Sequence, residues 1–237
     1  MSLNLAKSVE VPTRSRPRSA FGGLFRRKES WTLTLRGWLS LLGVVGLLTF
    51  GGILGVYPFL APTHRVDTEY LVVEGWVGDY ALVESIAEFK SKPYRLMFTV
   101  GCEMTSIVNI DPGDNHADYA FTRLKWLGMN PELIQPVVAH VKYRNRTYES
   151  ALAFRKWIEE KHLTVTRFNL VTVGPHARRS RLLFEKAFQG NAEIGVIAVE
   201  DPEYDSRRWW RYSEGVKEIM SEAASYFYVR LFFWPRG

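Results

Sequence analysis

Residues 168–188, FNLVTVGPHARRSRLLFEKAF, contain the pattern that decides the fold. The first six residues form a short apolar run rich in β-branched side chains, which predicts a buried strand. Gly174 and Pro175 end that run, and apolar residues then recur at helical spacing up to Phe188. The segment therefore predicts a strand, a tight turn and a helix. In open α/β sheets, ligands bind at the carboxyl ends of the strands, so the turn is also a candidate site.

Basic side chains occupy this turn and the start of the helix after it. His176, Arg178 and Arg179 lie where a helix N-terminus already carries partial positive charge and favours anions. A bound phosphate or carboxylate would account for them. The alternative is that one arginine pairs with a nearby acidic residue while the others are solvated, and the sequence leaves both interpretations open.

Strands and helices alternate in the same way through residues 67–237. The pattern predicts strands over residues 69–73, 94–100, 133–139, 168–173 and 194–199, and helices over residues 79–90, 118–127 and 147–161, after Pro175, and from about Arg208 toward Phe233. Helices between successive strands predict a parallel sheet with helices on both faces. We therefore expect a three-layer, Rossmann-like α/β domain with a mostly parallel sheet. Pro136 within the third strand favours an edge position or a distorted start.

The excess of basic residues is confined to the N-terminus. Residues 1–36 contain eight basic and two acidic residues, and this excess of six equals the net charge of the whole chain. The remaining 23 basic and 23 acidic residues cancel. A nucleic-acid-binding domain needs a basic face, so we expect no nucleic-acid partner. Residues 1–36 are polar and unpatterned, which predicts a flexible cytoplasmic tail.

Residues 37–60 form a run of 24 residues without a charged side chain. This length spans a bilayer with some tilt, and it exceeds the apolar region of a cleaved signal peptide. Because the basic residues precede the span, the positive-inside rule places the tail in the cytoplasm and residues 61–237 outside it. The sequence thus predicts a single-pass protein of the inner (plasma) membrane, with a linker over residues 61–66 and the α/β domain over residues 67–237.

Four turns that follow strands should meet at one edge of a parallel sheet. They comprise residues 74–76, 101–103, 144–149 and 174–179. The candidate ligand-binding residues at these turns, besides the basic residues after Pro175, are Gly75, Trp76, Gly101, Arg146, Thr147 and Gly174. The glycines would let the backbone turn tightly or approach a ligand closely. Thr147 is also a natural N-cap, and Glu149 suits the helix macrodipole, so both residues fit plain capping as well as a ligand role.

Two of the predicted helix starts resemble motifs of a known family. The YdcF-like group includes the SanA and ElyC envelope proteins and is called domain of unknown function 218. A segment like S-R-N-T-Y-E-N opens one of its helices, and H-x-x-R-A opens a later one. Residues 146–150, RTYES, and residues 176–180, HARRS, match these segments in order and spacing. The resemblance covers roughly residues 67–234. This chain departs from the family in its first turn, which has one glycine instead of several, and at Ser150, which replaces an asparagine.

The resemblance implies an inner-membrane protein whose periplasmic or extracytoplasmic domain takes part in envelope or peptidoglycan upkeep. It implies no particular reaction. From the residues themselves, His176 with Glu149 or Glu74 would form a general acid–base pair. Cys102, the only cysteine, would be a nucleophile beside His176, although a single buried cysteine more often serves packing.

A metal site and a nucleotide cofactor have weaker support. Asp111, Asp114, His116 and Asp118 cluster in one loop whose oxygen ligands suit a hard cation, but the EF-hand spacing is absent and a solvated loop is favoured. The motif G-x-G-x-x-G does not occur, so the sequence names no cofactor. The aromatic residues 226–234, YFYVRLFFW, would either touch the membrane interface or pack on the sheet.

The leading hypothesis is a membrane-anchored envelope protein that binds an anionic, phosphate-bearing precursor, such as a lipid-linked phosphate or phospho-sugar. His176, Arg178 and Arg179 would hold the anion, and Glu149 and Glu74 would be acid–base or hydroxyl-binding groups. Whether the protein then hydrolyses or transfers its ligand is open. One alternative is a non-catalytic assembly factor whose partners are other envelope proteins. Another is a binder of a nucleotide or an S-adenosylmethionine-like ligand, because a fold alone does not fix chemistry.

Overall fold

The computed structural model describes residues 19–20, 25–26, 32–104, 115–141 and 143–235. The chain divides into two units, residues 1–47 and residues 48–237. In the first unit, two short strands, β1 (Ser19–Ala20) and β2 (Phe25–Arg26), pair antiparallel. Helix α1 (Leu35–Leu60) begins in the first unit and ends in the second. The second unit therefore contains the end of the apolar helix as well as the α/β domain.

Helix α1 matches the predicted membrane span. It contains 26 residues and begins two residues before the uncharged run. Among the described helices, it is the one long and apolar enough to cross a membrane. Pro58 in its last turn cannot donate a backbone hydrogen bond, which is tolerated close to a helix end.

The second unit is built on a five-stranded sheet in which all strands are parallel. The strands are β3 (Tyr70–Glu74), β4 (Leu96–Cys102), β5 (Ile134–Ala139), β6 (Arg167–Val173) and β7 (Glu193–Val199). Their order across the sheet is β5-β4-β3-β6-β7. The predicted α/β class with a parallel sheet is confirmed. Pro136 lies in β5 at the edge of the sheet, where a missing N–H costs least.

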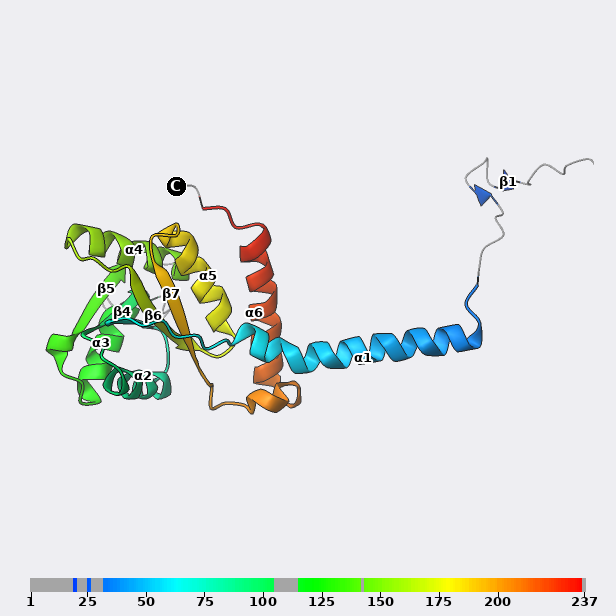
Figure 1. The fold of residues 1–237 in the computed structure, drawn as a ribbon, viewed down its shortest axis with the longest axis horizontal. Helices are drawn as coiled ribbons and strands as arrows, with labels where there is room; N and C mark the ends of the chain where they lie inside the picture. Colours follow the sequence, from blue (N-terminus) through cyan, green and yellow to red (C-terminus); the bar gives the residue numbers. More distant parts are fainter. Residues whose placement is uncertain (1–18, 21–24, 27–31, 105–114, 142, 236–237) are drawn as a thin grey trace, which may run out of the picture. The chain divides into compact units, whose positions relative to one another are not determined.

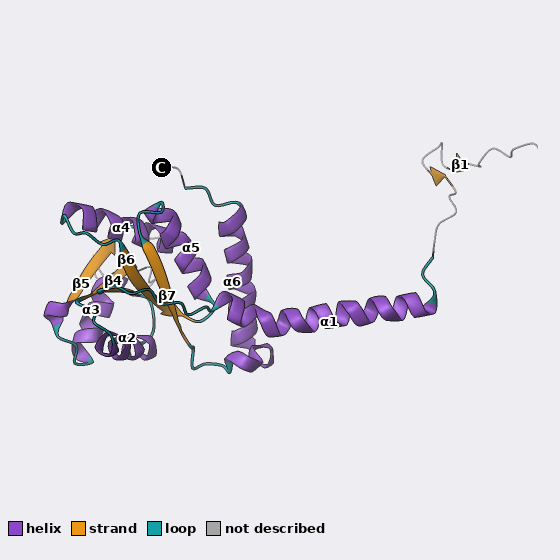
Figure 2. Ribbon diagram, viewed as in Figure 1, coloured by secondary structure: helices purple, strands orange, loops and turns teal. Residues whose placement is uncertain are grey.

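Helices cover both faces of this sheet (Figures 1 and 2). They are α2 (Asp79–Ser91), α3 (His116–Trp126), α4 (Arg146–Glu160), α5 (His176–Phe188) and α6 (Ser213–Leu231), with short 3-10 helices η1 (Pro131–Leu133) and η2 (Ser206–Arg211). Helices α2 and α3 pack on one face around Leu71 and Met97. Helices α4 and α5 pack on the other face around Phe154 and Phe168, and α6 lies beside α5. The result is the expected three-layer arrangement.

The strand order places a topological switch between β3 and β6. The chain moves from β3 outward to β4 and β5, and then returns to the other side of β3 to form β6 and β7. Crossovers that leave in opposite directions open a crevice at the carboxyl ends of the two strands, where α/β domains bind ligands. Because the strands are parallel, the turns after β3, β4, β5 and β6 lie at the same edge, as the sequence predicts.

The predicted linker over residues 61–66 is hydrogen-bonded to the sheet. His64 exchanges two backbone hydrogen bonds with Val196 of β7. The side chain of Asn169 accepts a bond from the Val66 amide at 2.8 Å and donates one to the Val66 carbonyl at 2.9 Å. Gly195 makes this approach possible, since a Cβ there would lie 1.9 Å from Asn169 Oδ1. The segment after α1 is therefore a fixed part of the domain.

Two local expectations are wrong. Thr147 is not the N-cap of α4, because Asn145 adopts a left-handed conformation with φ of 53° and the helix begins at Arg146. Asparagine tolerates this conformation better than most residues. The last predicted helix is two elements, because Tyr212 is extended between η2 and α6.

Candidate functional site

A cavity of about 1010 Å³ opens at the carboxyl edge of the sheet, beside the switch between β3 and β6. The sequence-predicted residues that line it are Glu74, Trp76, Gly101, Arg146, Thr147, His176 and Arg179. Helix α6 forms a further wall with residues that include Glu218, Glu222 and Tyr228. The ends of β3 and β4 and residues of the helices α3, α4, α5 and α6 thus meet here.

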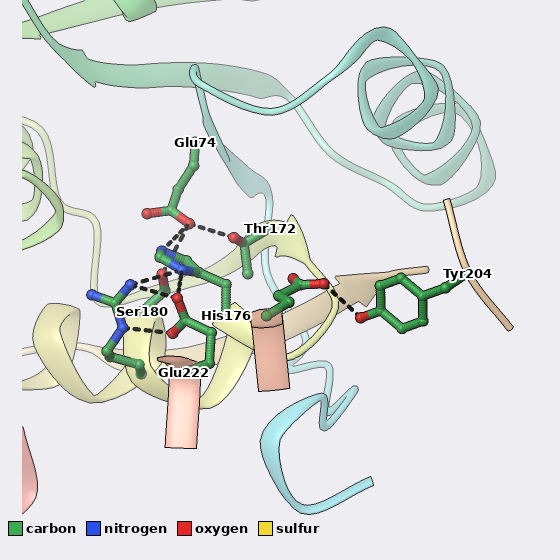
Figure 3. A network of polar contacts seen from close by, with 8 residues as sticks. Glu74, Thr172, His176, Ser180, Tyr204 and Glu222 are labelled. Carbon is green, nitrogen blue, oxygen red and sulfur yellow. Dashed lines mark hydrogen bonds and ion pairs between the residues drawn. The ribbon is translucent and has the colours of Figure 1, made fainter. Parts of the chain in front are cut away.

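Glu74 is a buried carboxylate at the end of β3, with an exposed fraction of 2 %. Its Oε2 atom accepts hydrogen bonds from the hydroxyls of Thr172 and Ser180, the latter at 2.9 Å (Figure 3). Thr172 lies on β6 and Ser180 on α5, so the contact joins both sides of the switch. The two hydroxyl donors fix the position of this carboxyl group at the strand end.

His176 begins α5 and lies between two carboxylates (Figure 3). Its Nδ1 atom is 3.0 Å from Glu222 Oε1, and its Nε2 atom is 3.7 Å from Glu74 Oε2. The same Nδ1 atom lies 2.9 Å from Arg179 Nη2, which can only donate, so Glu222 favours a proton on Nδ1 whereas Arg179 favours a lone pair there. The Nε2 atom is buried and has no hydrogen-bond partner among the described residues. The indole ring of Trp76 meets the imidazole edge-on at 4.7 Å.

Arg179 is held by the same glutamate. Its Nε donates to Glu222 Oε2 at 2.7 Å and its Nη2 to Oε1 at 3.0 Å. Burial alone would raise the pKa of Glu222, but the hydrogen bonds from His176 and Arg179 outweigh it and lower that pKa to about 2. The sequence left open whether the basic residues after Pro175 bind an anion or pair with an acidic residue. Arg179 pairs with an acidic residue, Glu222.

Arg178 and Gly174 lie outside the cavity lining, among the residues that the structure describes. Arg178 donates to the carbonyl of Phe59 at the end of α1, and its guanidinium lies 4.2 Å above the Phe59 ring. Gly174 has φ of +36°, and a Cβ there would meet the side chains of Tyr57 and Glu218 within 4 Å. Both residues therefore contact the last turns of α1, and Arg178 would not hold an anion in the cavity.

Gly75 and Gly101 make room for another part of the chain. A Cβ at Gly75 would lie 2.3 Å from the carbonyl oxygen of His116, and one at Gly101 would lie 2.7 Å from the amide of Ala117. These glycines let the first turn of α3 approach the strand ends, where a ligand was expected. The prediction that another group lies close to the backbone of Gly75 is therefore right, but that group belongs to helix α3 and is not a ligand.

The start of α4 is the part of the cavity with unpaired positive charge. Arg146 has a buried Nε atom without a hydrogen-bond partner among the described residues. Asn145 forms no side-chain cap, so its side chain satisfies no amide of the first turn. Burial, and then the charge of Arg146, lower the pKa of His116, which lines the cavity nearby. A helix N-terminus with an unsatisfied guanidinium favours a bound anion.

Two further candidates from the sequence have structural explanations. Glu149 is half-buried in the first turn of α4 and is not among the described residues that line the cavity, and Glu222 takes the place expected for it beside His176. Cys102 lies within 3.1 Å of the Arg146 carbonyl and 3.2 Å of Ser150 Oγ. Burial raises the pKa of the Cys102 thiol, which disfavours the nucleophilic thiolate.

The candidate metal loop lies largely outside the described residues, including Asp111 and Asp114. His116 begins α3, and Asp118 is bonded to the helix cap, Asn115. Within the described part of the chain, no group of three or more His, Cys, Asp or Glu side chains is placed to hold a metal ion.

The sequence pointed to the strand ends but missed the groups that α6 contributes. Glu218 and Glu222 are four residues apart on α6, so they lie on one face of that helix. Tyr204 donates to Glu218 Oε2 at 2.6 Å. Burial, followed by the charges of Asp201 and Glu222, raises the pKa of Glu218. The i,i+4 spacing of the two glutamates was the available signal.

Comparison with known proteins found no matching family model, no matching curated protein and no matching solved structure. The interpretation of the cavity therefore rests on its own geometry and on the sequence motifs.

Proposed function

We propose that this chain is a YdcF-like envelope protein, anchored in the inner membrane by α1, whose cavity binds an anionic, phosphate-bearing envelope precursor. The length and composition of α1 support the anchor. The basic residues before it support an extracytoplasmic α/β domain through the positive-inside rule. The cavity volume, about 1010 Å³, lies at the upper end of the range for small-molecule sites.

The phosphate would bind at the first turn of α4. Arg146 supplies a guanidinium whose Nε has no partner among the described residues, and the helix supplies amides that Asn145 does not cap. Arg179 is a weaker candidate because two of its nitrogens already bond Glu222. Charge-assisted hydrogen bonds from a guanidinium and a helix N-terminus are the usual means of holding a phosphate.

His176 is the group that would move a proton. In the tautomer that this role requires, Nδ1 donates to Glu222, and the free electron pair of Nε2 acts as a general base toward a hydroxyl or water of the bound ligand. Glu222 orients the ring and stabilises the imidazolium that forms, as the carboxylate does in other His–carboxylate pairs. Glu74, 3.7 Å from Nε2, would accept a hydrogen bond from the same hydroxyl.

The observation that carries the proposal is a pair of unsatisfied nitrogens. Among the described buried side-chain atoms, Arg146 Nε and His176 Nε2 have no hydrogen-bond partner, and both residues line the same cavity. Buried polar groups without partners are rare in native proteins and need a reason. A ligand that places an anionic group at α4 and a hydroxyl near α5 would satisfy both atoms.

The test is ligand-induced stabilisation of the full chain in detergent micelles. The panel contains lipid-linked phosphates, nucleotide-linked sugars, polyphosphates and S-adenosylmethionine. We expect a phosphate-bearing class to raise the melting temperature by mass action, and Arg146→Gln to lose that shift. Arg144→Gln is the matched control, because it removes the same charge from an exposed neighbouring position and should keep the shift.

Turnover of the ligand identified in this way tests the role of His176. His176→Gln should bind the ligand but lower any turnover by about 10²- to 10⁴-fold, the usual contribution of general acid–base catalysis. Equal ligand shifts in Arg144→Gln and Arg146→Gln would contradict the anion site. Stabilisation by no ligand in the panel would favour the assembly-factor alternative.

A further inference from the structure

The 3-10 helix η2 (Ser206–Arg211) presents an unusual group of exposed side chains. Its sequence is SRRWWR, and Arg207, Arg208, Trp210 and Arg211 are exposed. We call these four residues the η2 surface. Trp210, with an exposed fraction of 38 %, contacts the buried Trp209 edge-on at 5.9 Å. Three arginines and a tryptophan thus face solvent within five residues.

The arginines of the η2 surface are not used inside the domain. In the acidic loop just before η2, Asp205 caps the amide of Arg207, Asp201 accepts from the amide of Glu203 and the hydroxyl of Tyr80, and Glu200 accepts from the hydroxyl of Ser206. No ion pair within the described residues involves the side chains of Arg207, Arg208 or Arg211. Within the described residues, the acidic side chains of residues 200–205 form no ion pair with these arginines, so the three charges are available for an external partner.

Helix η2 is attached directly to the apolar helix. The buried indole of Trp209 donates its Nε1–H to the carbonyl of Ile53 in α1 at 3.1 Å. Trp209 and Leu60 belong to one apolar cluster, which also includes Ile219 of α6. Leu60 is fully buried there. The contact lies within the unit of residues 48–237, so the η2 surface is held next to the end of α1.

A residue count limits how far this contact can lie from the bilayer. Residues 53–60 of α1 contain its contacts with η2 and α6, and none of residues 35–52 is buried. Those 18 helical residues extend about 27 Å at 1.5 Å per residue. The hydrocarbon core of a bilayer is about 30 Å thick. When α1 spans the membrane, residues 53–60, which contact η2 and α6, lie at the level of the lipid headgroups.

We propose that the η2 surface binds anionic phospholipid headgroups and holds the domain against the bilayer that α1 spans. Arginine pairs with phosphate through its planar fork, and tryptophan is favoured where the bilayer meets water. The inference rests on the proposed membrane span and adds a second, electrostatic contact to it. It does not depend on whether the cavity binds a phosphate-bearing ligand.

The test measures depth at the neighbouring position in the full chain reconstituted in nanodiscs. A spin label is placed at Tyr212→Cys in a Cys102→Ser background, which leaves the η2 surface intact. The control label is at Lys125→Cys, on the exposed side of α3. In discs that contain phosphatidylglycerol, we expect the label at position 212 to collide with lipid-soluble oxygen and to be shielded from a water-soluble nickel complex. The label at position 125 should behave in the opposite way.

Charge removal then tests the arginines. Arg207, Arg208 and Arg211 are replaced by glutamine. The ratio of protein whose η2 surface touches the bilayer to protein whose η2 surface does not should fall about fivefold per arginine. This factor is the equivalent of ~1 kcal/mol for each arginine near an anionic membrane. The matched control replaces Lys90, Lys92 and Lys156, three exposed lysines elsewhere on the domain, by glutamine and should leave the ratio unchanged.

Two results would overturn the inference, and they have different meanings. Equal nickel accessibility at positions 212 and 125 in discs that carry the protein would show that the η2 surface does not touch the bilayer, while the membrane span stands. Failure of the chain to purify with the discs would show that α1 does not span, and the proposed anchor and this inference would then fall together.

Discussion

Glu222 carries the most strongly shifted charge at the cavity. Its pKa is about 2 in the folded chain, compared with an ordinary value near 4.5. Because the folded-state pKa is the lower one, the stabilisation is fully present above about pH 4.5 and is lost as the pH falls toward 2. The shift corresponds to roughly 3 kcal/mol of unfolding free energy.

The Glu222→Gln variant isolates this contribution. It should be less stable than the wild-type chain at pH 6, since Arg179 then lacks its partner, and the difference between the two unfolding free energies should shrink as the pH falls from about 4.5 toward 3. The measurement is chemical unfolding of both chains in micelles between pH 3 and 7. Because the charge of Glu222 helps to raise the pKa of Glu218, the same comparison is made in a Glu218→Gln background, where that contribution is absent. Parallel pH profiles would show that Glu222 is not the stabilising carboxylate.

His116 reports the electrostatic state of the proposed anion site. Burial and the charge of Arg146 hold its pKa below the ordinary value of 6.5. Arg146→Gln removes a repulsive charge and should raise that pKa, although burial keeps it below 6.5. A bound phosphate should raise it as well, because it offsets the same charge. An NMR titration of labelled histidines, with His116→Gln for assignment, measures both changes. If neither Arg146→Gln nor a bound phosphate changes the pKa of His116, Arg146 lies too far from His116 to influence it.

At the scale of elements, the segment between α1 and β3 depends on one glycine. A Cβ at Gly195 would lie 1.9 Å from Asn169 Oδ1 and 2.9 Å from the His64 carbonyl oxygen. Gly195→Ala should therefore cost about 2 kcal/mol or more of unfolding free energy, as overpacking at fixed backbone does. Combining it with Asn169→Ala tests the cause. The double variant should lose less than the sum of the single losses, and additive losses would show that Asn169 is not the obstacle.

Local sequence patterns predicted the strands and helices, but they did not predict the residues at which some of these elements begin and end. All five strands lie within two residues of the predicted ranges, because apolar runs bounded by Gly and Pro mark buried strands. The errors arose where backbone geometry decides, at the left-handed Asn145 and at the extended Tyr212. The partial site prediction has a similar origin. Strand-end residues meet because of topology, whereas Glu222 reaches His176 only because α6 packs beside α5.

At the scale of the whole molecule, the aromatic end of the chain serves two environments. Phe233 packs on Tyr148, with ring centroids 5.2 Å apart, and joins the core under α4 and α5. Phe227, Phe232 and Trp234 are exposed. The sequence offered membrane contact and core packing as alternatives because helical periodicity alone does not tell which side of a helix has a protein neighbour.

The contact between Leu60 and the pair η2 and α6 also sets the order of assembly. A ribosome makes α1 early, but Trp209 follows Leu60 by about 150 residues. At roughly 5–20 residues per second, the end of α1 waits roughly 7 to 30 s for its partners. During that interval the apolar side chains of its last turns lack their partners in the folded domain. The α/β domain is then completed against a helix that is already in place.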